Sequence, residues 1–429
     1  MRRIVSLPLA VLGFLLYHAF LLKWSKQSPE TFRQRAATNS QGELGDTHNS
    51  TLGFEKIFAI GFSDRTDKRD AMTMGASFVG IDLDWVEGVT LDSIPEKAYP
   101  ATWEIEREKP VELGCWRAHM DALQQIVADK ISSALILEDD ADWDVTLKAQ
   151  MLEFARGTRA VQRDKWTRGG RKSPSNPPGT PSPYGDDWDM LWLGFCGIES
   201  REDERLFYII PDDPTAPPVS RRSDFKHPGL VDQSQLQQAR IVFDAVGGVC
   251  TAGYAVTYDG ARKILAQLSM SPLNDPVDVA YGAMCDYTGP GDNFRCLAPY
   301  PPLIGTWRQT GSSERDSDIY YTGDDWHEAY SEDLVYSTML NAQRLANGEK
   351  TCLTQWEEAE YLEIDPTDFV SPRGFLYERP VPEARPTVSQ PEPSFNSPEI
   401  INPPNSPTSS SFPSPSIQAH GYMSHDALE

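Results

Sequence analysis

The sequence contains no Cys-x-x-Cys pair and no excess of positive charge, and each absence excludes a class of function. Its six cysteines stand singly, which argues against a structural zinc site, because such sites use closely paired ligands. Lys and Arg total 39 against 63 Asp and Glu, which gives a formal net charge of −24. A chain this acidic would be repelled by phosphate backbones, so we expect no nucleic-acid partner.

The cysteines leave two interpretations open. Several of them could be buried free thiols, or they could form disulfides if the chain folds in an oxidising compartment. Six cysteines allow about 15 complete pairings, and the sequence does not choose among them. Cys285 with Cys296 is the first pair that we expect.

Charged residues are also missing from residues 4–22, directly after a short basic N-terminus. The length of this segment is close to the roughly 20 residues with which a helix crosses a bilayer. We therefore expect a transmembrane signal anchor at 4–22, preceded by a cytosolic N-terminus at 1–3. A cleaved signal peptide is the alternative, but its apolar stretch is usually about 7–15 residues.

The orientation of this anchor depends on weaker signals. Lys23 and Lys26 follow the segment and offset the basic residues before it, so the positive-inside rule gives no clear answer. The N-glycosylation sequon Asn49-Ser50-Thr51 favours a lumenal body. We expect a single-pass type II protein of a secretory-pathway membrane, in the Golgi or the endoplasmic reticulum.

Apolar periodicity is missing from three further stretches. Residues 23–52 predict a flexible stem, and the Pro- and Ser-rich residues 371–429 predict a disordered tail. Such compositions bury too little apolar surface to offset the entropy of the chain. Residues 165–185, rich in Gly and Pro, predict a disordered loop inserted in the domain that occupies 53–370.

Within 53–370, short apolar runs alternate with helical patterns. Lys56–Ile60 and Ala134–Leu137 are typical of buried parallel strands, and Glu112–Ala128 predicts a helix with one apolar face. Further strands are expected at Phe78–Val86, Trp188–Leu193 and Ala252–Tyr258, the last followed by a helix with Asp259 as its cap. The alternation predicts an α/β fold with a mostly parallel central sheet and helices on both faces.

An acidic cluster follows directly after the strand at Ala134–Leu137 and comprises Glu138, Asp139, Asp140, Asp142 and Asp144. In open α/β sheets, ligands gather at the carboxyl ends of the strands. Carboxylates this close repel one another, and a divalent cation would neutralise them. Hard oxygen ligands favour Mg²⁺ or Mn²⁺ over zinc, and such an ion could clamp a diphosphate. The alternative is a solvated acidic loop.

Two other groups of residues suggest a ligand. The charged run Asp64–Arg69 follows the first strand, and its cations could meet a nucleotide phosphate or base, although such a run can also be a capped, solvated helix start. Glu112 and His119 lie on the predicted helix at Glu112–Ala128. A single histidine on a helix is more commonly a packed or hydrogen-bonded residue than a catalytic one.

Together and in this order, these features resemble glycosyltransferase family 25, which contains bacterial lipooligosaccharide galactosyltransferases and the collagen galactosyltransferase domain. The resemblance covers about Ile57 to Ile319. One departure is Ala118, where the family has a serine. The matching blocks are Ile60–Arg69, Glu87-Gly88, Glu112–His119, Leu137–Asp140, Trp188–Gly194, Gly253-Tyr254, Gly260-Ala261, Pro276–Asp278, Pro302–Ile304 and Ser317–Ile319.

This resemblance implies a GT-A-like nucleotide-sugar-binding fold for the glycosyltransferase domain at 53–370. It also implies a divalent metal, Mn²⁺ before Mg²⁺, and transfer with inversion from a UDP-sugar donor, commonly UDP-galactose. The acceptor would be a hydroxyl of a glycan or glycoprotein. Asp139 and Asp140, supported by Glu138, match the metal and diphosphate ligands of the family.

The remaining roles follow from the same resemblance. The expected donor-site residues are Arg65, Asp67, Arg69, Glu112 and His119. An inverting transfer needs a base to take the acceptor proton. We expect Asp278 as that base and Asp189 as a sugar-binding residue, with a cap or structural hydrogen bond as the alternative for both.

Two other functions stay open. A glycoside hydrolase needs only two carboxylates, with no metal and no nucleotide. A non-catalytic carbohydrate-binding or scaffold protein could also use a transferase-like fold, although the intact Glu138–Asp140 sequence argues against it.

Overall fold

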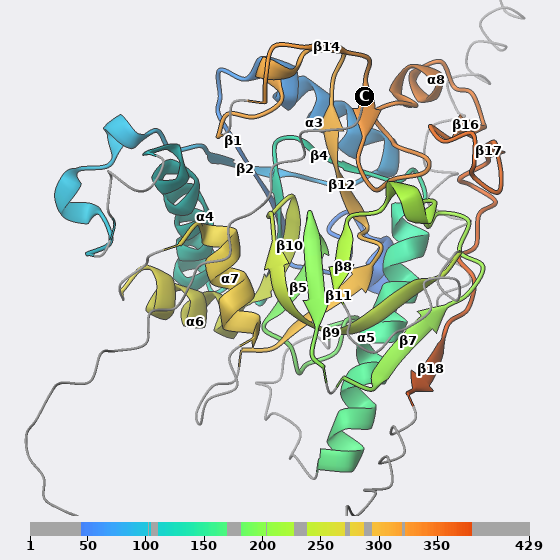
Figure 1. Ribbon diagram of the computed structural model, residues 1–429, viewed down its shortest axis with the longest axis horizontal. Helices are drawn as coiled ribbons and strands as arrows, with labels where there is room; N and C mark the ends of the chain where they lie inside the picture. Colours follow the sequence, from blue (N-terminus) through green and yellow to red (C-terminus); the bar gives the residue numbers. More distant parts are fainter. Residues whose placement is uncertain are drawn as a thin grey trace, which may run out of the picture. The chain divides into compact units, whose positions relative to one another are not determined.

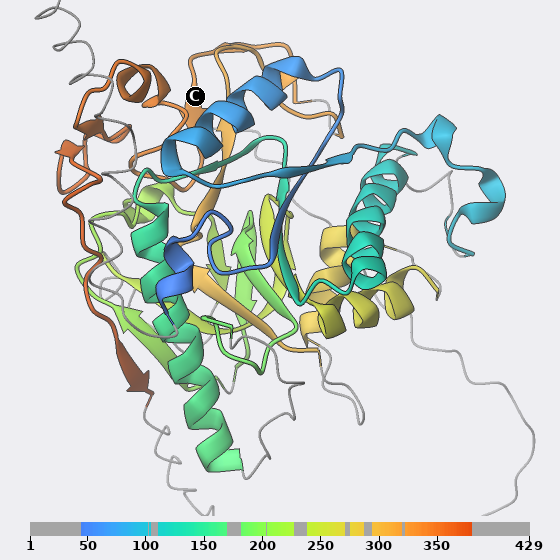
Figure 2. The same ribbon diagram turned by 180° about the vertical axis from the view of Figure 1, so that it is seen from behind.

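The computed structural model is shown in Figures 1 and 2. It describes residues 44–101, 103, 110–169, 182–202, 204–226, 238–270, 275–286, 294–319 and 322–379. The anchor expected at 4–22 lies outside these residues, as do most of the expected stem and tail. Within the described ranges, no helix has both the length and the apolar character needed to cross a bilayer.

A large mixed sheet forms the centre of the fold. Its main strands are β1 (Lys56–Gly61), β2 (Asp84–Glu87), β3 (Ser133–Glu138), β5 (Met190–Gly194), β7 (Leu206–Ile210), β9 (Arg240–Val249), β10 (Gly253–Thr257), β11 (Cys296–Tyr300) and β18 (Phe375–Glu378). They pair in the order β18-β7-β9-β11-β5-β10-β3-β1-β2. Strands β2, β1, β3, β5, β11 and β7 run in one direction, and β10, β9 and β18 run in the other. The predicted α/β class with a mostly parallel sheet is confirmed.

Smaller elements complete the described part of the chain. The remaining strands are β4 (Ala141–Trp143), β6 (Gly197–Ser200), β8 (Asp224–Lys226), β12 (Ile304–Arg308), β13 (Gly311–Ser312), β14 (Trp326–His327), β15 (Tyr330–Ser331), β16 (Cys352–Leu353) and β17 (Glu363–Ile364). The 3-10 turns are η1 (Gly45–His48), η2 (Leu91–Ser93), η3 (Glu96–Ala98), η4 (Val219–Arg221) and η6 (Ser313–Arg315), and a short helix α8 covers Ala342–Ala346.

Helices cover both faces of the sheet, as Figures 1 and 2 show from opposite sides. One face carries α4 (Pro110–Asp129), α6 (Tyr258–Leu268) and α7 (Val277–Asp286), and the other carries α3 (Thr66–Val79) and α5 (Leu147–Gly169). Alternate strand residues enter the two cores, so that Ile136 packs in one while Leu135 and Leu137 pack in the other. Strands buried on both faces have continuous apolar sequences, which made β1 and β3 recognisable.

Two predicted element boundaries are wrong. Phe78–Val86 is not one strand, because α3 continues to Val79 and β2 begins only at Asp84. Gly80 ends α3 in the left-handed conformation, with φ of 65°, which glycine adopts at little cost. Helix α6 is capped by Thr257 rather than Asp259, since the Thr257 hydroxyl accepts a hydrogen bond from Gly260 N.

Parts of the segments expected to be irregular are folded. Leu52, from the expected stem, is fully buried, and Tyr184, from the expected loop at 165–185, is fully buried and donates a hydrogen bond to its carbonyl oxygen. Residues 165–169 complete α5. Strand β18, from the expected tail, pairs with β7. These residues are ordered by packing against distant parts of the chain, and the apolar periodicity of the sequence does not reveal such packing.

The structure contains two disulfides, Cys196–Cys250 and Cys285–Cys296. The second is the pair that we expected from the sequence. Cys115 and Cys352 are free, and the Cys352 side chain is fully buried. Paired and unpaired cysteines are therefore both present.

Asp142 and Asp144 turn away from the acidic edge and anchor β4 to the segment 331–337. Asp142 accepts hydrogen bonds from the hydroxyls of Ser331 and Ser337. Both carboxylates are completely buried. The acidic cluster expected after β3 therefore includes only its first three members.

Asp144 should make the stability of the fold depend on pH. Burial raises its pKa to about 7 from 3.8, although hydrogen bonds from Thr146 and Tyr336 oppose the shift. A group whose pKa is higher in the folded protein than in the unfolded chain adds to the free energy of unfolding at low pH. This contribution is fully present below the pKa of the unfolded chain and is lost as the pH rises through the pKa of the folded protein. Between pH 6 and 8 the loss amounts to about 1.4 kcal/mol.

Asp144→Asn cannot ionise, so it should lose about 1.4 kcal/mol less unfolding free energy than the wild type between pH 6 and pH 8. Urea unfolding at the two pH values measures this difference, and the other titrating groups are common to both proteins. An equal loss in both proteins would show that Asp144 does not titrate in this interval.

Candidate active site

The carboxyl ends of several strands meet at one edge of the sheet. Gly61 at the end of β1 pairs with Glu87 of β2, and Ile60 pairs with Glu138 at the end of β3. Gly253, the first residue of the opposed strand β10, pairs with Leu137 and with Gly194 of β5. Open α/β sheets bind ligands at this position.

Asp139 lies in the turn after β3 and is held by a lysine of the charged run that follows β1. Its Oδ1 lies 2.8 Å from Lys68 Nζ of α3, and each of the two side chains is only 10% exposed. A Cβ at position 61 would lie 2.4 Å from Asp139 Oδ2, so the close approach requires Gly61. Burial raises the pKa of Asp139 to about 6, against the opposing charge of Lys68.

Asp140 faces a different cation. Arg308, the last residue of β12, donates from Nη1 to Asp140 Oδ2 at 2.8 Å and to the Asp316 carbonyl at 3.0 Å. Trp307 N donates to the Asp140 carbonyl, which fixes β12 beside the turn. Burial raises the pKa of Asp140, while Lys68 and Arg308 oppose the shift.

A third carboxylate, from the segment after β13, shares Lys68 with Asp139. Asp318 accepts hydrogen bonds from Lys68 Nζ at 2.7 Å and from Arg65 Nη1. Arg65 also binds Asp67, and this hydrogen bond is the main cause that lowers the pKa of Asp67 to about 2. Arg65 and Lys68 therefore already hold an anion at the start of α3, where the helix dipole also favours negative charge.

Glu138 lies between a threonine and a histidine. Its Oε1 accepts a hydrogen bond from Thr251 Oγ1 and lies 3.5 Å from His119 Nε2. His119 Nδ1 lies 2.8 Å from the hydroxyl of Tyr254, inside the core. Burial acts to raise the pKa of Glu138, but His119, Thr251 and Lys68 together hold it below its usual value. The carboxylate is therefore kept ionised.

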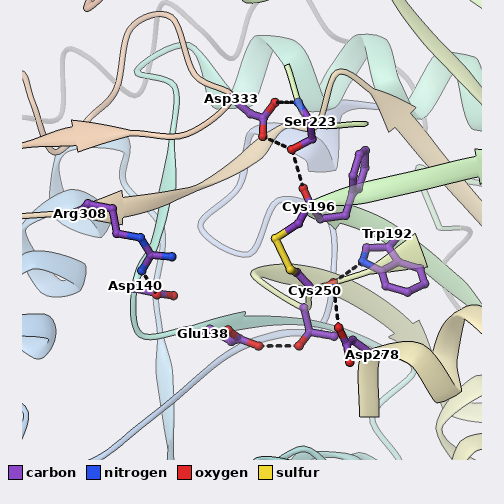
Figure 3. The surroundings of a disulfide bond; sticks show 11 residues. Glu138, Asp140, Trp192, Cys196, Ser223, Cys250, Asp278, Arg308 and Asp333 are labelled. Atoms are coloured by element: carbon purple, nitrogen blue, oxygen red, sulfur yellow. Dashed lines mark hydrogen bonds and ion pairs between the residues drawn. A yellow bond between two sulfur atoms is a disulfide. The ribbon is translucent and has the colours of Figure 1, made fainter. Parts of the chain in front are cut away.

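Asp278 and Glu112 belong to the same region. Asp278, in the first turn of α7, accepts a hydrogen bond from Cys250 N at 2.8 Å, and the next residue, Thr251, donates to Glu138, as Figure 3 shows. Burial, followed by the charges of Glu138, Asp278 and Glu112, raises the pKa of the Cys115 thiol. The charges of all three carboxylates therefore act on the thiol of Cys115, on α4.

Of two further expected site residues, Asp189 lies away from this edge, and Arg69 lies at the edge with its donors bound to the protein itself. Asp189 precedes β5, so it lies at the opposite end of the sheet from Gly194, and both of its oxygens bind Lys263 Nζ at 2.7 Å. Arg69 donates to the carbonyls of Phe62 and Gly61 and holds the ends of β1 and β2 together.

The site residues expected from the sequence did not include four contributors, Lys68, Arg308, Asp318 and Thr251, although Lys68 lies in the charged run and Asp318 in a block of the family resemblance. Lys68 stands one helical turn after Arg65 in the charged run, a spacing that could have identified it. The other three contact Asp140, Lys68 and Glu138 across 168, 250 and 113 residues, respectively. No local signal connects residues that far apart.

The acidic edge offers an incomplete metal site. Asp139 and Asp140 supply the hard oxygen ligands that Mg²⁺ and Mn²⁺ prefer. Among the residues that the structure describes, no three His, Cys, Asp or Glu side chains are arranged to hold a metal by themselves. Mg²⁺ commonly binds through one or two carboxylates plus substrate phosphates, so two buried aspartates fit an ion completed by its substrate.

Curated relatives of the chain are distant. Procollagen galactosyltransferase 2 of Mus musculus is 20% identical over 245 residues, covering 54% of this chain and 31% of that protein. Procollagen galactosyltransferase 1 of Danio rerio is 19% identical over 285 residues, covering 62% and 39%. Procollagen galactosyltransferase 2 of Homo sapiens is 18% identical over 244 residues, covering 54% and 31%.

The chain spans only 31–39% of the length of these relatives, and no protein-family model matches it. The matches nevertheless agree with the resemblance to glycosyltransferase family 25, at the level of distant homology. They support a galactosyltransferase-like protein and leave its donor, metal and acceptor to be tested.

Lys68→Met should destabilise the fold strongly, because it leaves Asp139 and Asp318 without their shared cation. Removing one partner of a buried ion pair costs about 3–5 kcal/mol. Lys56→Met is the matched control, since Lys56 pairs with Asp84 at the surface, where both side chains are about half exposed. Urea unfolding should show a large loss for the first variant and little change for the second.

The double variant Lys68→Met/Asp139→Asn should recover part of the lost stability, because it no longer buries an unpaired charge. If Lys68→Met and Lys56→Met changed the free energy of unfolding equally, Asp139 and Asp318 would be hydrated well enough to stay charged without Lys68.

Proposed function

We propose that this chain is a metal-dependent, inverting glycosyltransferase that moves a hexose from a UDP-sugar to an acceptor hydroxyl. Galactose is the hexose that we propose. The observation that carries the proposal is the pairing, at one sheet edge, of buried carboxylates with a neighbouring cationic pair that already binds an anion. Asp139 and Asp140 form the first part, and Arg65 and Lys68 form the second. The distant procollagen galactosyltransferase relatives point to the same class.

The diphosphate of the donor would take the position of Asp318. The carboxylate of Asp318 sits on Arg65 and Lys68, and a phosphate group has the same charge sign and accepts the same hydrogen bonds. Arg65 suits this role because its guanidinium can bind two oxygens at once. The proposal therefore includes an exchange of an internal anion for the donor.

Asp139 and Asp140 would hold the divalent cation, which supplies positive charge against the departing UDP. Lys68 and Arg308 neutralise these carboxylates in its absence. Glu138, which remains ionised, would support Asp139 and Asp140 with a third negative charge beside the cation. In this scheme Asp189 and Arg69 have structural roles, in line with their surroundings.

The acceptor side of the site would be served by Asp278. An inverting transfer needs a carboxylate or another base that accepts the proton of the attacking hydroxyl. Asp278 reaches the region of Glu138 from α7 and is oriented by Cys250 N. It comes from a different element than the residues proposed to bind the diphosphate, which lie on α3 and in the turn after β3.

We infer a secretory-pathway location from two features of the described chain. Two disulfides agree with folding in an oxidising compartment. Asn49 of the sequon is exposed, as an acceptor of an N-glycan has to be. The Golgi and the endoplasmic reticulum both satisfy these conditions. The acceptor would then be a glycan or glycoprotein of that pathway.

A donor screen tests the reaction class. The purified domain is incubated with several nucleotide-sugars, with and without Mn²⁺, and released nucleotide is measured. We expect UDP from UDP-galactose only when metal is present. Asp139→Asn and Asp140→Asn should reduce release at least about a hundredfold. Asp259→Asn, an exposed carboxylate at the start of α6, should leave the rate unchanged.

Each alternative has its own result in this screen. Cleavage of an aryl glycoside without metal would favour a hydrolase. Binding of a carbohydrate acceptor with no nucleotide release, even when that acceptor is supplied, would favour a non-catalytic carbohydrate-binding protein.

Asp318→Asn should tighten the binding of UDP, because the nucleotide no longer has to displace a carboxylate from Arg65 and Lys68. We expect the dissociation constant in the presence of Mn²⁺ to fall about tenfold, which equals about 1.4 kcal/mol. Asp324→Asn changes an exposed acid in the same segment and serves as the control. Isothermal titration calorimetry measures both, and weaker binding by Asp318→Asn would make Asp318 a ligand of the donor complex instead.

A further inference from the structure

Residues Cys250 and Thr251 connect β9 to β10 directly beside the acidic edge. Cys250 forms the disulfide with Cys196, which follows β5, and so ties this connection to a second strand end. The backbone of Cys250 has φ of 65°, a left-handed conformation that is disfavoured for a residue with a β-carbon. Non-glycine residues in this conformation persist where surrounding contacts hold them, and often at functional sites.

Three hydrogen bonds fix this pair of residues, and two of them end on site carboxylates. Cys250 N donates to Asp278 Oδ2 at 2.8 Å, and Thr251 Oγ1 donates to Glu138 Oε1. The Cys250 carbonyl accepts from Trp192 Nε1 at 2.9 Å, and Trp192 is fully buried. Figure 3 shows these contacts converging on the disulfide.

The other half of the disulfide is equally well anchored. Cys196 N donates to the Val249 carbonyl at 3.0 Å, and the preceding carbonyl, of Phe195, accepts from Ser223 Oγ at 3.2 Å. Ser223 N in turn donates to Asp333 Oδ1 at 2.7 Å. The disulfide therefore joins two segments that are each pinned to the surrounding fold, as Figure 3 shows.

We propose that the disulfide-bonded Cys250 and its neighbour Thr251 are positioning residues for the transfer reaction, because the Cys250 amide orients Asp278 and the Thr251 hydroxyl orients Glu138. This inference rests on the proposed function, and it adds residues that act through the site carboxylates without touching substrate. Glu138 comes from β3 and Asp278 from α7, so no local geometry fixes their separation. The Cys250–Thr251 pair supplies that constraint.

The hydrogen bond from Thr251 to Glu138 can be removed by a substitution that hardly changes the side-chain volume. Valine has nearly the volume of threonine but cannot donate to Glu138, whereas serine keeps the donor. Thr215 offers a matched control, because its hydroxyl donates to Asp213 in a buried cluster that contains none of the residues of the proposed site. Thr251→Val and Thr215→Val thus each remove a hydroxyl–carboxylate hydrogen bond, and Thr215→Val also removes a long contact with Arg240.

Steady-state kinetics with UDP-galactose and Mn²⁺ separate positioning from binding. We expect Thr251→Val to lower kcat about tenfold or more, with the KM of the donor changed less than about twofold. Thr251→Ser should restore most of kcat, and Thr215→Val should leave kcat unchanged while its melting temperature falls comparably. Equal kcat in Thr251→Val and wild type, or an effect confined to KM, would overturn the inference.

The two disulfides allow a second comparison. Cys196→Ser/Cys250→Ser should lower kcat about as much as Thr251→Val, because the Cys250–Thr251 backbone is released. Cys285→Ser/Cys296→Ser removes the bridge between the end of α7 and the start of β11, and it should leave kcat unchanged. Melting temperatures confirm that both proteins are folded during the assay. An equal loss of kcat in the two variants would contradict a specific role for Cys250.

A readout without catalysis keeps this inference separate from the proposed function. Burial and the charges of Glu138, Asp278 and Glu112 raise the pKa of the half-buried Cys115 thiol, so a displacement of these carboxylates should make the thiol more reactive. We expect iodoacetamide to alkylate Cys115 several times faster in Thr251→Val than in wild type or Thr215→Val, as followed by peptide mass spectrometry. An unchanged rate would overturn the inference even if transfer were observed. A faster rate in a protein without transferase activity would refute only the proposed function.

Discussion

The arrangement of the sheet edge depends on neutralising three successive carboxylates that are largely removed from water. Asp139 and Asp140 are each paired with a cation from a different part of the fold, and Glu138 lies between His119 and Thr251. An unpaired buried charge would be very costly, so these partners are conditions for the turn after β3 to exist in this form. Because Lys68 belongs to α3 and Arg308 to β12, these ion pairs also hold both elements against the turn after β3.

The same charge balance explains how one edge could serve chemistry as well as folding. Lys68 and Arg65 hold Asp318 where an anionic ligand would be favoured, and Lys68 and Arg308 compensate carboxylates that suit a divalent cation. Internal ion pairs of this kind can be exchanged for ligand contacts without a large change in net charge. On the opposite side, the disulfide-anchored Cys250–Thr251 connection orients carboxylates from β3 and α7. The sheet edge thus combines ion pairs that a ligand could replace with a connection, Cys250–Thr251, that a disulfide holds in place.

Some elements could be predicted because their burial has a local signature. Strands β1 and β3 are buried on both faces and appear as unbroken apolar runs, and the apolar face of α4 recurs at helical spacing. The division of the acidic cluster could not be predicted, because nothing in the local sequence shows that Asp142 and Asp144 turn into the core toward the segment 331–337. Asp189 was expected at the site from the family resemblance, whereas the structure places it before β5, at the opposite end of that strand from Gly194.

By itself, the sequence determined the α/β class, the strand that carries Glu138, and the placing of Asp139 and Asp140 directly after it, because periodicity and strand ends are local properties of the chain. Only the tertiary structure decided which carboxylates face the edge, which cations neutralise them, and that Thr251 and Cys250 reach Glu138 and Asp278. These contacts join residues separated by 28 to 250 positions, and they form only when packing brings distant segments together. Pairwise electrostatics depends on distance in space, which the order of residues along a chain does not specify.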